Sequence, residues 1–277
     1  MAKKYITLAN KVIYIKIVSD RNKLKDLKNK KEKQTPSAEA VRRYNERIAE
    51  KTLSMILNWN FKPYDIFATL TYANAPTPEE SKKLFRNFRD RLKRYCEKNN
   101  IEYKWVVCTE YENTRIHHHI VLPKMPYEDL ANIWKYGNIK VSPLYEDGDY
   151  RPLAHYMIKE TKNSFNAPDS VYKQRYSCSG KIKMPETREI PASEKTLTKE
   201  PKSIKGYHID KDSIIQGRNP VTGIPYLEYV LVSDTPIPRY KKWTKGKKVK
   251  TKEKTYEKLY EQLVERQTEI NLNDLTY

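Results

Sequence analysis

Three consecutive histidines stand inside a short apolar run, and this arrangement constrains the fold more than any other feature of the chain. Residues 105–122 read WVVCTEYENTRIHHHIVL, where β-branched and apolar residues flank the polar segment 112–114. This pattern predicts two β-strands joined by a turn. Because side chains alternate between the two faces of a strand, we expect His117 and His119 on one face and His118 on the other.

Two imidazoles on one face of a strand can bind a single cation. Histidine is a ligand for Mn, Zn, Fe or Co, and an added carboxylate shifts the preference toward Mg or Mn. Glu110 and Glu112, on the preceding strand and turn, are the nearest candidates for a third ligand. Histidines that merely pack against a sheet are the commoner alternative, so the metal interpretation depends on the rest of the chain.

The balance of charges indicates a polyanionic partner. The 277 residues include 54 Lys and Arg against 35 Asp and Glu, which gives a net charge of +19. Such an excess, spread over several segments, is typical of nucleic-acid-binding proteins, although a solvated basic surface is the alternative. The sequence has no GxxxxGK phosphate loop, so we expect neither ATP binding nor an ATPase motor.

Cysteine usage and hydropathy indicate a cytoplasmic protein. Cys96, Cys108 and Cys178 are far apart and form no CxxC pair, which excludes a zinc ribbon or a disulfide framework and fits a reducing cytosol. Polar residues such as Asn10 and Lys16 interrupt the apolar run near the N-terminus. No segment approaches membrane-spanning length, so we expect no signal peptide and no membrane partner.

Hydrophobic periodicity predicts further elements on both sides of the histidine strand. They are strands at 5–18, 66–72 and 139–143, and helices at 37–58, 78–99, 126–136 and 151–160. The segment Thr77-Pro78-Glu79-Glu80 predicts a helix start, with threonine as N-cap, proline at the first helical position and acids near the positive helix end. We expect the strand at 66–72 in the same sheet as the strand at 5–18.

The C-terminal part of the chain predicts a hairpin and a basic tail. Apolar runs at 209–215 and 226–232 flank a loop rich in turn residues, as in a β-hairpin. The lysine-rich run 239–254 contains Tyr240 and Trp243, which could stack on exposed bases, although a flexible solubilising linker is the alternative. A short terminal helix is expected at 256–267.

Three short motifs follow one another at residues 69–72, 110–119 and 156–159. They read TLTY, then an acid followed by three histidines, then YMIK. In this order the sequence resembles the HUH endonucleases, in particular the single-tyrosine rolling-circle replication initiators of small phages and plasmids. The resemblance covers about residues 64–163, with a weaker echo at 175–179. Each motif is short, but the three in order are far more specific than any one.

The resemblance implies a metal centre for Mg²⁺ or Mn²⁺. Its ligands would be His117 and His119, with Glu110 as the third and Glu112 as the reserve. The sequence departs from the family pattern between the two ligands, where it has His118 instead of an apolar residue.

The resemblance also implies a nucleophile and contacts with DNA. Tyr156 matches the tyrosine that attacks the phosphate, and Lys159 lies one turn away, where it could stabilise the phenolate or orient the phosphate. No second tyrosine lies one turn from Tyr156, which fits a one-tyrosine enzyme. The candidate DNA contacts are Thr69, Thr71, Tyr72, His155, Tyr240 and Trp243.

The fold that the resemblance implies is α+β, with a central five-stranded antiparallel sheet and packed helices, as in HUH or RRM-like cores. The histidines would lie on a central strand, and the tyrosine helix would cover that face. We expect a nicking domain at 1–165, an extension with the hairpin packed on the core at 166–235, and a basic linker with a C-terminal helix at 236–277.

The function that the resemblance implies is a replication initiator in the cytoplasm of a bacterial host. It would nick and rejoin single-stranded DNA at an origin through a 5′-phosphotyrosine link, leaving a 3′-hydroxyl primer, with a host helicase and a DNA polymerase as partners. A transposase or relaxase would share the same motifs, although the length and the basic C-terminal extension favour an initiator. In another class, the chain could be a nucleic-acid-binding protein without catalysis.

Overall fold

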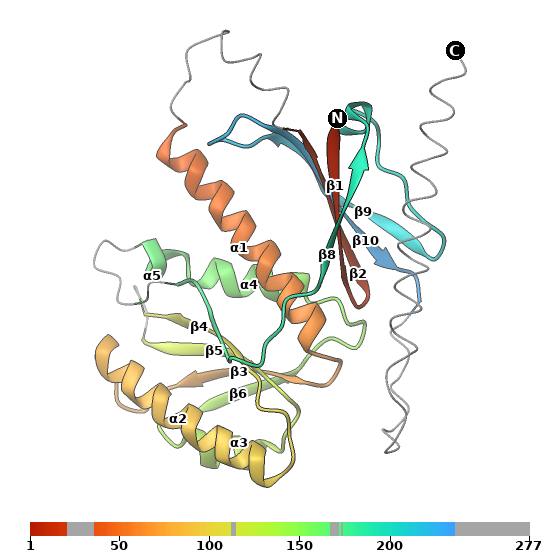
Figure 1. Ribbon diagram of the computed structural model, residues 1–277. Helices are drawn as coiled ribbons and strands as arrows, with labels where there is room; N and C mark the ends of the chain where they lie inside the picture. The colour runs from red at the N-terminus through yellow and green to blue at the C-terminus, as the bar shows by residue number, and fades with distance from the viewer. Residues whose placement is uncertain (21–35, 112–114, 167–171, 173, 236–277) are drawn as a thin grey trace, which may run out of the picture. The chain divides into compact units, whose positions relative to one another are not determined.

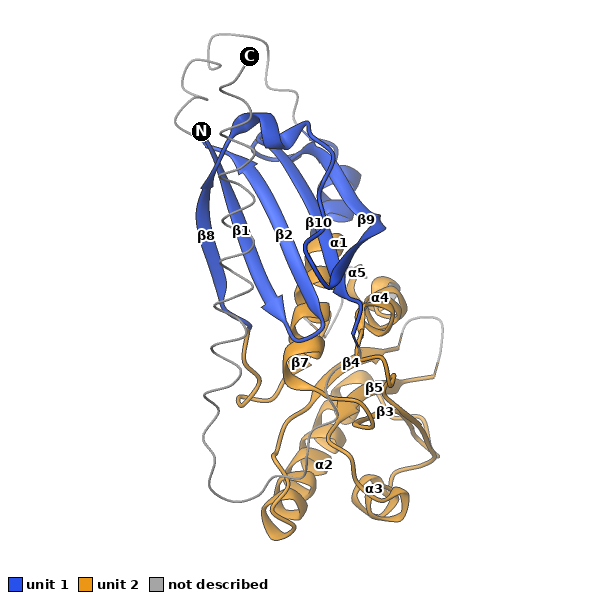
Figure 2. Cartoon of the chain, turned by 90° about the vertical axis from the view of Figure 1, so that its right-hand side faces the viewer, with its two compact units in different colours: residues 1–45, 185–277 blue, residues 46–184 orange. Residues whose placement is uncertain are grey.

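The computed structural model describes residues 1–20, 36–111, 115–166, 172 and 174–235. The chain forms two compact units, shown in Figure 2: a terminal unit of residues 1–45 and 185–277, and a central unit of residues 46–184. Both contain a five-stranded antiparallel sheet, so the expected α+β class is confirmed. None of the described helices is long and apolar enough to cross a membrane.

The central unit is built on a sheet in the order β6-β3-β5-β4-β7, visible in Figure 1. Its strands are β3 (Ile66–Thr71), β4 (Val106–Glu110), β5 (His117–Leu122), β6 (Ile139–Pro143) and β7 (Ser177–Cys178). The histidine strand β5 is therefore the middle strand, as expected. Its neighbours β3 and β4 both run antiparallel to it.

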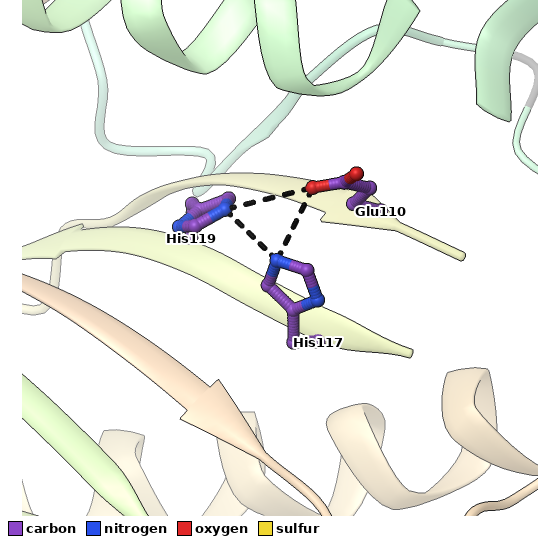
Figure 3. A group of neighbouring side chains, drawn as sticks. All are labelled: Glu110, His117 and His119. Atoms are coloured by element: carbon purple, nitrogen blue, oxygen red, sulfur yellow. Dashed lines mark hydrogen bonds and ion pairs between the residues drawn. The ribbon is translucent and has the colours of Figure 1, made fainter. Parts of the chain in front are cut away.

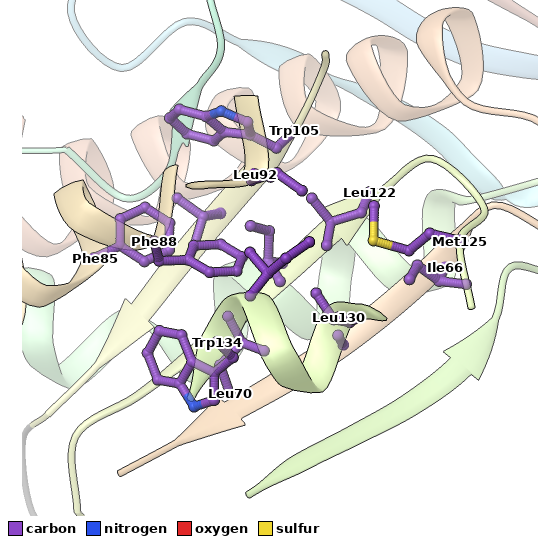
Figure 4. Close-up of a cluster of buried hydrophobic side chains, with 14 of the residues drawn as sticks. Ile66, Leu70, Phe85, Phe88, Leu92, Trp105, Leu122, Met125, Leu130 and Trp134 are labelled. Atoms are coloured by element: carbon purple, nitrogen blue, oxygen red, sulfur yellow. The ribbon is translucent and has the colours of Figure 1, made fainter. Parts of the chain in front are cut away.

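One face of this sheet is covered by α2 (Pro78–Lys98) and α3 (Tyr127–Trp134). Helix α2 begins where the sequence predicts, because Thr77 caps it in a capping box with Glu80. The apolar core beneath these helices is shown in Figure 4. It includes Leu70, Phe88, Leu92, Ile120 and Trp134, all fully buried.

The opposite face is covered in part by α4 (Arg151–Glu160) and by the C-terminal half of α1 (Ala38–Asn60). Both helices lie within two residues of their predicted bounds. Their apolar residues pack on the β4 and β5 side of the sheet, and a short α5 (Lys162–Asn166) follows α4. The members of this core include Leu53, Leu57, Val106, Cys108, Val121, Leu153, Met157 and Ile158.

The terminal unit contains a second sheet in the order β8-β1-β2-β10-β9. Its strands are β1 (Ala2–Ala9), β2 (Val12–Ser19), β8 (Thr187–Ala192), β9 (Tyr207–Arg218) and β10 (Pro225–Ser233), with a 3₁₀ helix at Glu194–Leu197. The predicted hairpin at 209–232 is confirmed as β9 and β10. Buried isoleucines and leucines of four strands form the core, including Ile6, Ile15 and Leu231.

Two expectations about the N-terminal segment were wrong. Residues 5–18 are not one strand but parts of a hairpin, β1 and β2, whose turn places Asn10 in the left-handed region with φ 54°. The turn escaped prediction because Asn10-Lys11 lacks the glycine that usually marks a tight hairpin turn. This hairpin also belongs to a different sheet from the strand at 66–72.

The expected division into 1–165, 166–235 and 236–277 stays a prediction about independent folding. The basic run at 239–254 and the helix expected at 256–267 lie outside the described residues. The segment after α4 holds β7 and β8, which the sequence did not predict because they are short and rich in polar residues.

Candidate metal centre

Glu110, His117 and His119 converge on one face of the central sheet. In the antiparallel register Glu110 lies opposite His117, and Cys108 lies opposite His119. Opposite residues of antiparallel strands project to the same face, so the carboxylate and both rings meet. The two Nε2 atoms are 3.1 Å apart, and Glu110 Oε2 is 3.2 Å from Nε2 of His117 and 4.0 Å from Nε2 of His119, as Figure 3 shows.

Hydrogen bonds on the far side of each ring aim the Nε2 atoms at this point. Nδ1 of His117 donates to the backbone oxygen of Arg115 over 2.8 Å, so a neutral His117 ring carries its lone pair on Nε2. Nδ1 of His119 is 3.2 Å from Oγ1 of Thr69 on the neighbouring strand. Such outer partners fix the tautomer and orientation of metal-binding histidines.

The electrostatics of the group suit a cation. Burial, and then the neighbouring His117, lower the pKa of His119 to about 4, so its ring is neutral at neutral pH, as metal binding requires. Burial raises the pKa of Glu110, and Glu160 raises it further. Among the described side chains, Glu110 has a buried oxygen, Oε2, that makes no hydrogen bond. A divalent ion would satisfy this oxygen, so the donor set of two imidazoles and a carboxylate fits a metal ion.

Tyr156 lies beside this group on α4. Its ring centroid is 5.3 Å from that of His119 and 6.0 Å from that of Phe67, in edge contacts with both. The side chain is 39% exposed, whereas Met157 and Ile158 hold the helix on the sheet. Partial burial raises the pKa of Tyr156, and the carboxylates of Glu160 and Glu110 raise it further.

The other residues of the tyrosine motif lie at the surface. Lys159 is exposed near the C-terminal end of α4, three residues after the tyrosine. His155 is also exposed, and its Nδ1 lies 3.1 Å from a carboxylate oxygen of Glu50 on α1. Both side chains are therefore accessible to a ligand.

His118 points to the opposite face, as its place in the strand predicts. It is fully buried, and burial, followed by its two histidine neighbours, lowers its pKa to about 3. Its ring nitrogens contact the hydroxyls of Tyr72, over 2.7 Å, and Thr109, over 2.8 Å. The sequence suggested that Tyr72 contacts DNA, but Tyr72 is only 5% exposed and lies in the core.

The remaining sequence candidates divide into two groups. Thr71 lies on the same strand as Thr69, and its hydroxyl donates to the backbone oxygen of Asn138. Glu112, Tyr240 and Trp243 lie outside the described residues. The echo at 175–179 has a structural role at Ser179, whose hydroxyl accepts the backbone N–H of Trp105.

Sequence reasoning missed two neighbours of the site. Glu160 hydrogen-bonds Glu110, and it lies one helical turn after Tyr156, a spacing that could have indicated a shared face. Phe67 stacks on the His119 ring with centroids 5.7 Å apart. Its signal was the alternation of β3, which places Phe67, Thr69 and Thr71 on one face.

Comparison with known proteins finds one family. Residues 65–161 match the model of a family described as Replication-associated protein ORF2. This stretch, about a third of the chain, holds β3 to α4 and therefore all three motifs. The match is consistent with a rolling-circle replication initiator. No curated protein and no solved structure matches the chain significantly.

Proposed function

We propose that this protein starts DNA replication by nicking single-stranded DNA at an origin through a tyrosine nucleophile. The observation that carries the proposal is the position of Tyr156, whose ring contacts His119 of the metal-binding group. Two independent features support it, namely the family match over residues 65–161 and the net charge of +19.

The reaction is a transesterification at phosphorus. A divalent ion held by Glu110, His117 and His119 would bind a non-bridging oxygen of the scissile phosphate and stabilise the charge that develops there. The Tyr156 oxygen forms a bond to phosphorus while the bond from phosphorus to the 3′ oxygen breaks. The phenol proton is balanced by the proton that the departing 3′ oxygen gains.

The products explain the link to replication. The DNA 5′ end stays on the tyrosine as a phosphodiester, and the 3′-hydroxyl is free to prime a polymerase. Because the covalent link conserves the phosphodiester, the same site can rejoin ends without ATP. Strand separation and synthesis then fall to a host helicase and a host polymerase.

Residues around Tyr156 have supporting tasks in this proposal. The raised pKa of the phenol, caused by burial and then by Glu160 and Glu110, keeps it protonated in the free protein. A cation at the carboxylate, together with the exposed Lys159 ammonium, would favour the phenolate during attack.

An open stretch of the same sheet face offers a path for the DNA strand. The edge strand β6 pairs with β3 so that Lys140 lies opposite Thr69 and Ser142 lies opposite Phe67. Both β6 residues are exposed and project to the face of the metal-binding group. Lys140 could therefore bind a phosphate next to the scissile one.

A denaturing gel tests the proposal. The protein is mixed with single-stranded oligonucleotides that cover its own origin region, with Mn²⁺ or with chelator. We expect a slowly migrating adduct that survives SDS, requires the metal and disappears in Tyr156→Phe. Tight DNA binding without an adduct on any strand would instead support a binding protein without catalysis.

A further inference from the structure

The middle histidine of the triplet occupies a position that packing alone would give to an apolar residue. His118 is fully buried, and its ring contacts Phe85, with centroids 4.6 Å apart, and Trp134, with centroids 5.8 Å apart. A polar ring in such surroundings is unfavourable unless its nitrogens are hydrogen-bonded. A neutral imidazole has one donor and one acceptor, and the hydroxyls of Tyr72 and Thr109 occupy both.

These two bonds lie directly behind the metal-binding group. Thr109 precedes Glu110 in β4, and His118 separates His117 from His119 in β5. Thr109 and His118 are opposite each other in the register, so their side-chain bond joins β4 to β5 on the far face. The pair thus links the backbone positions from which all three ligands project.

The position of this bond along the ladder matters. The pair Glu110 and His117 is the last one between β4 and β5, and pairs at the end of a ladder open most easily. Sliding the pairing by one residue would turn the ligands to the other face. The bond between Thr109 and His118, one position further in, resists both changes.

The contacts continue from the strands into α2. The Tyr72 hydroxyl donates to the backbone oxygen of Ser81 over 3.3 Å, and the Ser81 hydroxyl lies 2.7 Å from that of Tyr172. Tyr172 also hydrogen-bonds Thr109. Strands β3, β4 and β5 are therefore fixed to one helix through His118 and its partners, and fully satisfied networks of this kind are rigid.

We propose that His118 is a positioning residue for the metal centre. Through Thr109 and Tyr72 it holds the ends of β4 and β5 in the register that brings Glu110, His117 and His119 together, without binding the metal itself. The inference rests on the proposed function only in its assumption that the group binds a divalent ion.

Manganese affinity tests this role without DNA. Thr109→Val and Tyr72→Phe each remove one hydroxyl bonded to His118 and keep the shape of the side chain. We expect each to weaken Mn²⁺ binding by about three- to tenfold, less than the 10- to 100-fold typical of a direct partner of a ligand. Binding is measured by electron paramagnetic resonance, whose Mn²⁺ line shape also reports a distorted site.

Tyr136→Phe is the matched control, because Tyr136 packs on Tyr72 from the same face but its hydroxyl accepts from Arg91. It should leave Mn²⁺ affinity unchanged. A second check uses His118→Leu, in which the Tyr72→Phe change should have no further effect on affinity. Thermal melting of each variant separates a general loss of stability from a change at the metal centre.

The outcomes distinguish this inference from the proposed function. If Thr109→Val and Tyr72→Phe lower the melting temperature but bind Mn²⁺ like the wild type, His118 has only a packing role and the positioning inference is wrong. If both weaken binding while Tyr136→Phe does not, the inference stands. An absent DNA adduct in a wild-type protein that binds Mn²⁺ contradicts the nicking proposal alone.

Discussion

Oγ1 of Thr69 lies 3.2 Å from Nδ1 of His119, on the side of the ring opposite its Nε2 atom. Strand pairing produces this contact, because Thr69 of β3 and His119 of β5 are directly opposite in the register. The threonine therefore orients the ring from a strand that carries none of the three ligands. Motif residues that look like ligand contacts in a sequence can act instead by positioning a ligand.

Replacing this threonine should weaken metal binding. Thr69→Val keeps the shape of the side chain and removes the partner of Nδ1, so the His119 ring loses its fixed tautomer and orientation. Partners of this kind change metal affinity by about 10- to 100-fold, and we expect at least the lower value for Mn²⁺ in a calorimetric titration.

Thr71→Val is the control for this change. Thr71 lies two residues later on the same face of β3, but its hydroxyl donates to the backbone oxygen of Asn138. Its loss should leave Mn²⁺ affinity within about twofold of the wild-type value, since no ligand depends on it. Equal effects of the two variants would show that Thr69 acts through the strand and not through the histidine.

Glu110 should lower the stability of the metal-free protein. Its Oε2 atom is buried without a hydrogen bond, and Glu160 lies next to it. Glu110→Gln removes the charge and keeps the shape, so we expect the metal-free variant to be more stable by about 1 kcal/mol. Mn²⁺ should raise the melting temperature of the wild type and not that of the variant. A variant that is less stable without metal would contradict this account.

The sequence predicts the metal-binding group well because the responsible rules are local. Alternation along β5 separates His117 and His119 from His118, and a short polar turn places β4 beside β5. The register that sets Glu110 opposite His117 follows from the length of that turn, so the near acid was the correct first choice within the described residues. The capping box at Thr77 determined the start of α2 in the same local way.

What the sequence did not predict depends on pairing between distant segments. Strand β1 pairs with β8, far along the chain, and β2 pairs with β10. No local pattern specifies such partners, so the second sheet was missed although β9 and β10 were recognised. Tyr72 was misread for a similar reason, because its burial depends on α2 and on His118, which its own local sequence does not specify.

Lys140 should contribute one phosphate contact to single-stranded DNA binding. Lys140→Gln removes a charge on the open side of the metal-bearing face, so the dependence of log affinity on log salt should become shallower by about 0.7. Fluorescence anisotropy with a labelled origin oligonucleotide measures this slope. Lys83→Gln is the control, because Lys83 is exposed on α2, which covers the opposite face. Equal slopes for the two variants would place the DNA elsewhere.

A buried lysine makes the stability of the terminal unit depend on pH. Lys4 of β1 is 8% exposed and lies between Ile17 and Ile190 of the neighbouring strands. Burial lowers its pKa from 10.5 to about 8. The folded state therefore binds the proton more weakly than the unfolded state. The resulting penalty is complete below pH 8, and stability is regained as the pH rises from 8 to 10.5.

Lys4→Met should remove this penalty. At about 1.4 kcal/mol per pK unit, the lowered pKa corresponds to roughly 3 kcal/mol at about pH 7, so the variant should be more stable there and the difference should shrink toward about pH 10. Urea unfolding followed by circular dichroism at both pH values measures it. Lys3→Met is the control, since Lys3 is exposed in an ion pair with Glu189 and such pairs contribute little. A Lys4→Met variant that is less stable near neutral pH would mean that the folded unit holds the charge favourably.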